Sequence, residues 1–243
     1  AIAAMAYGTE TVPQVYKIFG PGNQYVTKAK ALVQQEGVAI DMPAGPSEVL
    51  IVADETAVPE YVAADLLSQA EHGSDSQVIL LSDSEKMLDS IQEELKKQTA
   101  LLPRKDIANG ALQNSRVILF KTIQTCIDFS NKYAPEHLII ASNRAEDYVD
   151  QITTAGSVFL GNYSCESAGD YASGTNHTLP TNGFSKSYSG VNLDSFTKSI
   201  TFQEITEEGI QKIGKSIELM AAAEGLDAHK NAVSIRLKGL DSL

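Results

Sequence analysis

Val49-Leu-Ile-Val-Ala53 is an unbroken apolar run in the first quarter of the chain. Such a run is typical of a strand inside a parallel sheet, where helices cover both faces of the strand. A turn at 43–48, rich in proline and glycine, precedes this strand, and Pro59 opens a helical pattern after it. A buried strand followed by a helix is the repeating unit of α/β folds.

The same alternation continues along most of the chain. We expect further strands at 38–41, 77–81, 116–120, 138–141 and 157–160. We expect helices at 23–36 (capped by Asn23), 59–72, 84–99 (capped by Ser84), 123–133 and 145–153. This order predicts an α/β fold with a doubly wound, mostly parallel, Rossmann-like sheet. Beyond it, Ser195–Glu204 has threonine-rich strand character, and two helices at 210–224 and 227–237 form a small C-terminal helical segment.

Composition restricts the classes of partner. The chain has 243 residues and a formal net charge of −12, which argues against binding to nucleic acid or to an anionic membrane surface. No apolar run is long enough to span a membrane. The two cysteines, Cys126 and Cys165, have no metal-type spacing, and a reducing cytoplasm suits them best. Ala1–Tyr7 looks like the interior of a helix without an initiator Met, so we expect a chain that begins in mid-protein.

The stretch Asn162–Thr181 follows the last strand and has neither a helical nor an alternating apolar period. It places Glu166, Asp170 and His177 among small residues. Long loops of this kind are usually functional when ordered, so we interpret it as a site loop. A flexible surface connection is the alternative.

Each of the four histidines lies near a carboxylate in the sequence: Glu71-His72, Glu136-His137, Asp170 with His177, and Asp227-Ala-His229. Imidazole and carboxylate are common zinc ligands. Gln69 and His72, three residues apart, would share one helix face and could aim at one point. These patterns favour a zinc site, although packed or solvated histidines are common, and a metallohydrolase fits as well as any other zinc enzyme.

Two further patterns could contribute to a site. Open parallel sheets bind ligands beyond the carboxyl ends of their strands, and the acidic and histidine-bearing segments fall there or at helix ends. Glu136-His137 has acid–base potential, but neighbours on a strand point to opposite faces, so the pair needs the bend that Pro135 favours. The turn 19–23 could direct amides at a phosphate, although a simple capped turn explains it as well.

Six motifs, in order along nearly the whole chain, carry a resemblance to one enzyme family. They are Lys17-Ile-Phe-Gly-Pro-Gly-Asn23, Ile40-Asp-Met-Pro-Ala-Gly-Pro-Ser47-Glu48, Gln69-Ala-Glu-His72-Gly, Tyr133-Ala-Pro-Glu136-His137-Leu, Glu166-Ser-Ala-Gly-Asp170-Tyr-Ala-Ser-Gly-Thr-Asn-His177 and Glu224-Gly-Leu-Asp-Ala-His229-Lys-Asn. Together they resemble the L-histidinol dehydrogenases. The resemblance implies oxidation of histidinol to histidinal and then to histidine with two NAD⁺, the last steps of histidine biosynthesis.

The resemblance also implies roles for particular residues. Zinc, one per subunit, would be bound by Gln69, His72, Asp170 and His229, with His229 supplied across a homodimer. Glu136 and His137 would be the acid–base pair, and Asn23 would contact NAD. Substrate contacts would come from Ser47, Gln69, His72, His137, Asp170, His177, Glu224 and His229.

Members of this family carry a further N-terminal part. Residues 1–49 would be the remainder of a nucleotide-binding Rossmann-like domain, 50–190 the main α/β domain with the zinc and catalytic residues, and 191–243 a helical dimerisation segment. We therefore expect the chain by itself to be an inactive fragment that binds NAD poorly. Two other interpretations are a zinc hydrolase on an α/β fold with Glu136 as general base, and a non-catalytic binding or dimerisation module.

Overall fold

The computed structural model describes residues 1–240, and its centre is a five-stranded sheet in which every pairing is parallel. The strand order is β5-β4-β3-β6-β7, which is the order of a Rossmann sheet counted from β3. The strands are β3 (Glu48–Ala53), β4 (Gln77–Ser82), β5 (Arg116–Leu119), β6 (His137–Ala141) and β7 (Ser157–Leu160). The α/β fold class is thus confirmed.

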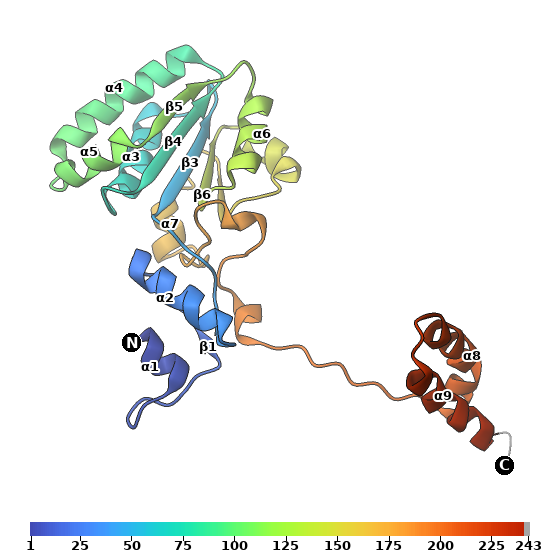
Figure 1. Cartoon of the computed structure of the whole chain (residues 1–243). Helices are drawn as coiled ribbons and strands as arrows, with labels where there is room; N and C mark the ends of the chain where they lie inside the picture. Colours follow the sequence, from blue (N-terminus) through green and yellow to red (C-terminus); the bar gives the residue numbers. More distant parts are fainter. Residues whose placement is uncertain (241–243) are drawn as a thin grey trace. The chain divides into compact units, whose positions relative to one another are not determined.

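Helices cover both faces of this sheet, which is why β3 is apolar without alternation. α3 (Pro59–Ala70), α4 (Glu85–Leu101) and α5 (Lys105–Gln113) lie on one face, and α6 (Ile123–Tyr133) lies on the other (Figure 1). Val49 and Ile51 point into the core under α3 and α4, while Leu50 and Val52 point toward α6. Every residue from Val49 to Ala53 is 0% exposed, so this part of β3 is completely enclosed.

The N-terminal part belongs to the same compact unit, which extends from Ala1 to Phe196. It contains α1 (Ile2–Tyr7), β1 (Lys17–Ile18), α2 (Gln24–Gln35) and β2 (Ala39–Ile40), and the two short strands pair in parallel. The side chain of Asn23 accepts hydrogen bonds from the amides of Tyr25 and Val26 and so caps α2, as predicted. The proposed boundary at residue 49 stays a prediction.

The second unit begins at Thr197 and contains α8 (Glu207–Ala223) and α9 (Asp227–Leu240). The strand expected at Ser195–Glu204 is wrong: Ser195 lies in the 3₁₀ turn η3 (Leu193–Phe196), and 197–206 has no regular secondary structure. Threonines favour strands only where a neighbouring strand supplies a pairing edge, and 197–206 is exposed and belongs to no sheet in the described part of the chain. No helix in the part of the chain that is described is long and apolar enough to cross a membrane.

Three local predictions also need correction. The stretch Asn162–Thr181 contains a helix, α7 (Glu166–Tyr171), which is too short for an apolar period to be visible. The helix expected at 145–153 is the 3₁₀ helix η1 (Ala145–Gln151). α5 was not predicted at all, and it follows α4 after a break at Leu102 and Pro103.

Candidate active site

The candidate residues gather at the amino edge of the sheet, so the expectation of a site beyond the carboxyl ends is wrong. Glu48 and His137 are the first residues of the neighbouring parallel strands β3 and β6. The helix that follows β3 runs back across the sheet, and it brings Gln69, near its C-terminal end, to the same edge. The Gln69 amide oxygen accepts a hydrogen bond from the Glu48 amide at 3.2 Å.

At the carboxyl edge, in contrast, the chain's own polar groups bond to one another, beside a pocket of about 520 Å³ that none of the candidate residues lines. Asp54 follows β3, and its carboxylate accepts hydrogen bonds from the Ser142 hydroxyl and from the Thr56 amide. Asn162, beyond β7, donates to the Thr56 carbonyl at 3.1 Å and to Asn143 at 3.2 Å. These bonds tie together the loops after β3, β6 and β7, where a Rossmann sheet would otherwise receive a ligand.

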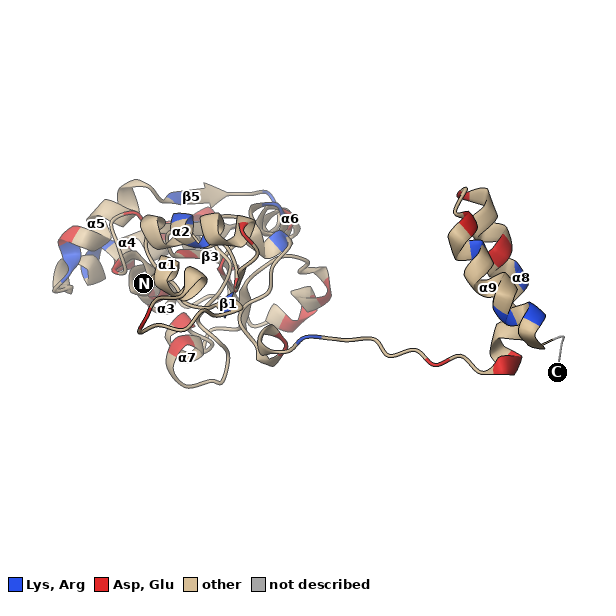
Figure 2. Cartoon of the chain, turned by 60° about the horizontal axis from the view of Figure 1, so that its bottom comes forward, with Lys and Arg blue, Asp and Glu red and all other residues tan. Residues whose placement is uncertain are grey.

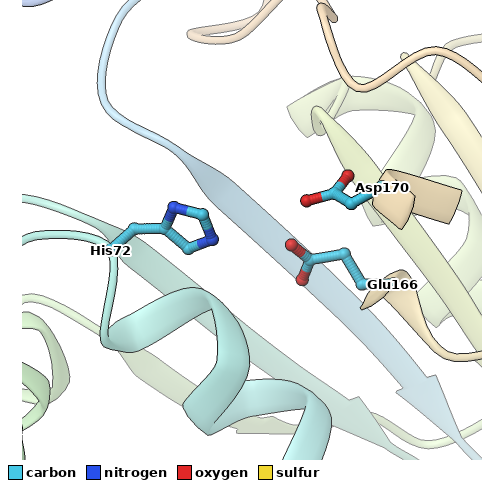
Figure 3. Close-up of side chains that lie close together, drawn as sticks. All are labelled: His72, Glu166 and Asp170. Carbon is cyan, nitrogen blue, oxygen red and sulfur yellow. The ribbon is translucent and has the colours of Figure 1, made fainter. Parts of the chain in front are cut away.

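A cluster of possible metal ligands lies where α3 ends and α7 begins. One ligand atom from each of His72, Glu166 and Asp170 lies within 4.8 Å of the others (Figure 3). Glu166 and Asp170 are four residues apart on α7, so they share one helix face. Gly169, on the same helix, lets α7 pack closely against β7, because a Cβ at this position would lie only 2.6 Å from the Phe159 ring.

Gln69 joins the cluster from α3. It is 1% exposed, and when its amide is oriented to satisfy both of its ends, the nitrogen donates to both oxygens of the Glu166 carboxylate. The prediction that Gln69 and His72 share one helix face is wrong, because α3 ends at Ala70 and His72 lies beyond the helix. His72 instead reaches the same carboxylate from the turn that follows the helix.

The chemistry of these donors suits a zinc ion. An imidazole nitrogen, carboxylate oxygens and an amide oxygen are ligands that zinc accepts. Burial, together with the charges of Asp170 and Asp65, raises the pKa of Glu166 to about 8. If the Gln69 amide turned its oxygen to Glu166 instead, two oxygens would face each other, and only a proton or a cation between them would stabilise that arrangement. The cluster therefore favours a positive charge.

Glu136 and His137 both contact the peptide groups of Glu48. The Glu136 carboxylate accepts a hydrogen bond from the Glu48 amide at 2.8 Å. His137 Nδ1 lies 3.1 Å from the Glu48 carbonyl oxygen, which can only accept, so Nδ1 carries the proton. The predicted bend is confirmed: the backbone bends at Glu136, directly before β6 begins at His137.

The tautomer leaves His137 Nε2 with a free lone pair. Nε2 is buried, has no hydrogen-bond partner within residues 1–240, and lies 3.9 Å from an oxygen of Asp170. Burial lowers the pKa of His137, so the ring is neutral near pH 7. A neutral imidazole with an unused nitrogen beside a metal-ligand cluster is arranged as a general base.

Glu136 has the most strongly raised carboxyl pKa of the site. Its pKa is raised to about 9 in total. Burial is the largest cause, the charges of Glu48, Glu166 and Asp170 act in the same direction, and the hydrogen bond from the Glu48 amide acts against them. Glu136 Oε2 and His137 Nδ1 are 3.7 Å apart, but with these shifts a neutral acid and a neutral imidazole face each other, not an ion pair.

The raised pKa values of Glu136 and Glu166 predict how metal and pH together control stability. Both carboxyls titrate near 4.5 in the unfolded chain and near 9 and 8 in the folded one. Their stabilising contribution is therefore present below about pH 4.5 and is lost as the pH rises through 8 to 9. We expect metal-free protein to melt several degrees lower at about pH 9 than at about pH 6.

Bound zinc should remove this pH dependence because it stabilises the ionised carboxylates. Thermal unfolding followed by circular dichroism, with chelator and with zinc at both pH values, measures the effect. Glu166→Gln, which cannot ionise, is the matched control and should reduce the pH dependence of the metal-free protein to the part that Glu136 contributes. Equal melting temperatures of the chelated wild-type chain at the two pH values would contradict the prediction.

A pocket of about 220 Å³ lies beside Glu136. Ser47 and His177, both predicted as substrate contacts, line it together with Glu136 and the turn Gly20–Gly22. Asn23 follows this turn, but its side-chain oxygen is engaged in capping α2.

The remaining predicted residues lie in the second unit. Glu224 is the C-terminal cap residue of α8, and His229 lies near the start of α9. Both residues belong to the second compact unit, and their part in the site stays a prediction.

Two residues of the site were not assigned a role from the sequence. Glu48 acts through its backbone, which no residue pattern reveals. Glu166 could have been found from its spacing to Asp170, if the short helix between them had been recognised.

The chain matches the family model described as histidinol dehydrogenase over residues 1–237. It is 62% identical over 238 residues to a histidinol dehydrogenase of Bacteroides fragilis, covering 98% of this chain and 56% of that protein. It is 59% identical over 242 residues to one of Pseudoalteromonas translucida, covering 99% and 56%. The chain thus spans about half the length of the curated relatives it matches.

Solved structures agree with this match. The crystal structure of histidinol dehydrogenase from Elizabethkingia anophelis superimposes with a TM-score of 0.97 at 65% identity, over 99% of this chain and 55% of that one. A gamma-glutamyl phosphate reductase from Thermotoga maritima, at 15% identity and a TM-score of 0.52, covers 84% of this chain and 56% of that one, and shares the fold alone. On the family model and these identities, the chain belongs to the histidinol dehydrogenase family.

Proposed function

We propose that this chain is the C-terminal part of a zinc-dependent, NAD-linked histidinol dehydrogenase. The enzyme would oxidise L-histidinol to L-histidine through L-histidinal, using two NAD⁺, in the last steps of histidine biosynthesis in the cytoplasm. The observation that carries the proposal is His137, whose free Nε2 lies 3.9 Å from Asp170 in the metal-ligand cluster. A base next to a metal-bound alcohol is the arrangement that such an oxidation needs.

Gln69, His72 and Asp170 would hold the zinc together with His229 of the partner subunit. The donor set fits when the Gln69 amide turns its oxygen toward the Glu166 carboxylate, beside His72 and Asp170, because a cation there would stabilise the facing oxygens. Zinc, when bound, supplies a centre that holds and orients the substrate's imidazole and amine. Ser47 and His177, which line the pocket beside Glu136, and Glu224 would contact the rest of the substrate.

His137 would act in the first oxidation. NAD⁺, when bound next to Asn23, supplies the hydride acceptor for both oxidations. As the hydride leaves the carbinol carbon, His137 Nε2 takes the proton of the hydroxyl group, and the aldehyde forms. The bond from His137 Nδ1 to the Glu48 carbonyl keeps the ring in the required tautomer.

Glu136 would act in the second oxidation. Its ionised carboxylate takes a proton from water while the water oxygen bonds to the aldehyde carbon, and the protonated His137 returns its proton to the aldehyde oxygen, which gives a hydrate. As the hydrate loses its hydride to the second NAD⁺, His137 Nε2 takes a proton from one of its hydroxyl groups, and the carboxylic acid forms. The Glu48 amide holds the Glu136 carboxylate in place throughout.

The shared zinc ligand leads to a prediction about assembly. If His229 completes the site of the partner subunit, zinc binds only the assembled dimer and stabilises it. Chelation should then weaken the dimer. Its dissociation constant should rise about tenfold for each 1.4 kcal/mol by which bound zinc had stabilised it. Analytical ultracentrifugation with zinc and with chelator measures this, and His229→Gln should behave as the chelated wild type. Equal dimer affinity in the two conditions would count against a shared site.

The function itself is tested in a full-length protein that contains this chain. NADH absorbance should rise when histidinol and NAD⁺ are added, and two NADH should form for each histidinol consumed. Removing zinc with a chelator should stop the reaction, and added zinc should restore it. Zinc-loaded protein that binds histidinol but forms no NADH would overturn the proposal.

A further inference from the structure

A buried ion pair lies beside the pocket, and the proposed reaction does not use it. Lys30, on α2, bridges to Asp41, which directly follows β2, and their side chains are only 5% and 1% exposed. Charges are costly to bury unless their remaining hydrogen bonds are made as well. The partners that complete these bonds therefore show what the pair holds in place.

Those partners are backbone groups on both sides of the pair. The Gly20 amide donates to Asp41 Oδ2 at 2.8 Å, and Lys30 Nζ donates to the Gly20 carbonyl at 2.9 Å. The Met42 amide donates to Asp41 Oδ1, also at 2.8 Å. Gly20 has a φ of 140°, which other residues rarely adopt. The ion pair thus binds both polar backbone groups of this one glycine and fixes its conformation.

The fixed glycine begins a turn that forms part of the pocket wall. Gly20, Pro21 and Gly22 line the pocket of about 220 Å³ together with Glu136 and His177. Lys30 and Asp41 line it too, so the turn and its support lie at one cavity. A second tie runs from the Thr27 hydroxyl to the Ala44 carbonyl at 2.9 Å and holds the loop after β2 to α2.

We infer that Lys30 and Asp41 are positioning residues, which hold the Gly20–Gly22 turn at the pocket for cofactor binding and hydride transfer. The inference rests on the proposed function, in which Asn23, directly after this turn, contacts NAD. Neither side chain touches the metal-ligand cluster in the contacts described above. Hydride transfer is sensitive to placement, since a displacement of about 1 Å can cost roughly 100-fold in rate.

The test removes the pair without leaving a charge behind. Lys30→Met together with Asp41→Asn keeps both side-chain volumes, whereas either change alone would leave a buried charge uncompensated. In the full-length protein we expect the KM for NAD⁺ to rise about tenfold or more, while zinc content and histidinol affinity stay within about twofold. Lys28, the other basic residue of α2, is exposed, and Lys28→Met serves as the matched control. Figure 2 marks the basic positions of α2 in blue.

Hydrogen exchange gives a readout that does not depend on activity. The amides of Gly20 and Met42 should exchange faster in the double variant, while those of β3 remain protected. An unchanged KM for NAD⁺, or losses of zinc and histidinol binding in proportion to melting temperature, would mean that the pair only stabilises the fold. Absence of NADH formation by the wild type would refute the proposed function instead, and unchanged exchange at Gly20 would refute the positioning role.

Discussion

In a full-length protein that contains this chain, His137→Asn is expected to abolish turnover of histidinol while the protein keeps its fold and its zinc. Loss of a general base typically lowers the rate by about 10²–10⁴. The Asn side chain can still donate to the Glu48 carbonyl from about the position of Nδ1, but it has no basic nitrogen where Nε2 lies 3.9 Å from Asp170. The strand start and the cluster should therefore stay intact, and only proton transfer should fail.

Three measurements separate this from simple destabilisation. Elemental analysis should find wild-type zinc in His137→Asn, calorimetry should find histidinol bound, and the rate of NADH formation should fall. Tyr133→Phe is the control, because it removes a nearby, partly buried hydrogen bond, from the Tyr133 hydroxyl to Gln77, that plays no part in the chemistry. Zinc loss in the His137 variant would show that His137 is a ligand and that its assigned role as base is wrong.

The fold could be predicted because the buried strands have a recognisable apolar sequence. Val49–Ala53 is apolar at every position since helices cover both of its faces, and the pattern therefore indicates a parallel sheet. Caps were equally visible, as at Asn23 and Ser84, whose side chains bond the first amides of α2 and α4. The false strand at Ser195–Glu204 shows the limit, because strand propensity without a pairing partner gives no strand.

The sequence named the candidate residues, whose roles stay predictions, but it did not predict where in the fold they lie. His72, Glu136, His137 and Asp170 were named from the sequence, yet the general rule for parallel sheets directed them to the wrong edge. The reason is physical: α3 and α7 return the candidate residues to the edge where β3 and β6 begin, and the contacts that direct these helices form only when the chain folds. The backbone role of Glu48 was equally hidden, since any residue type supplies an amide and a carbonyl.

Glu136→Gln is expected to separate the two oxidations. Gln keeps an oxygen that can accept from the Glu48 amide, so the geometry of the strand start is preserved. It cannot take a proton from water, so oxidation of histidinal should slow by about 10²–10⁴, whereas the first step, which uses His137, continues. The variant should therefore form one NADH per histidinol and release the aldehyde.

The pH profile provides the second half of this prediction. Burial raises the pKa of Glu136 to about 9, so below that value the ionised fraction grows about tenfold per pH unit. Zinc beside Asp170 opposes the neighbouring negative charges and moves this rise to lower pH. Wild-type oxidation of supplied histidinal should increase with pH across the rise, and Glu136→Gln should lose that dependence. If the variant still made two NADH per histidinol at the wild-type rate, water activation would belong to another group, and Glu136 would only be a structural partner of the Glu48 amide.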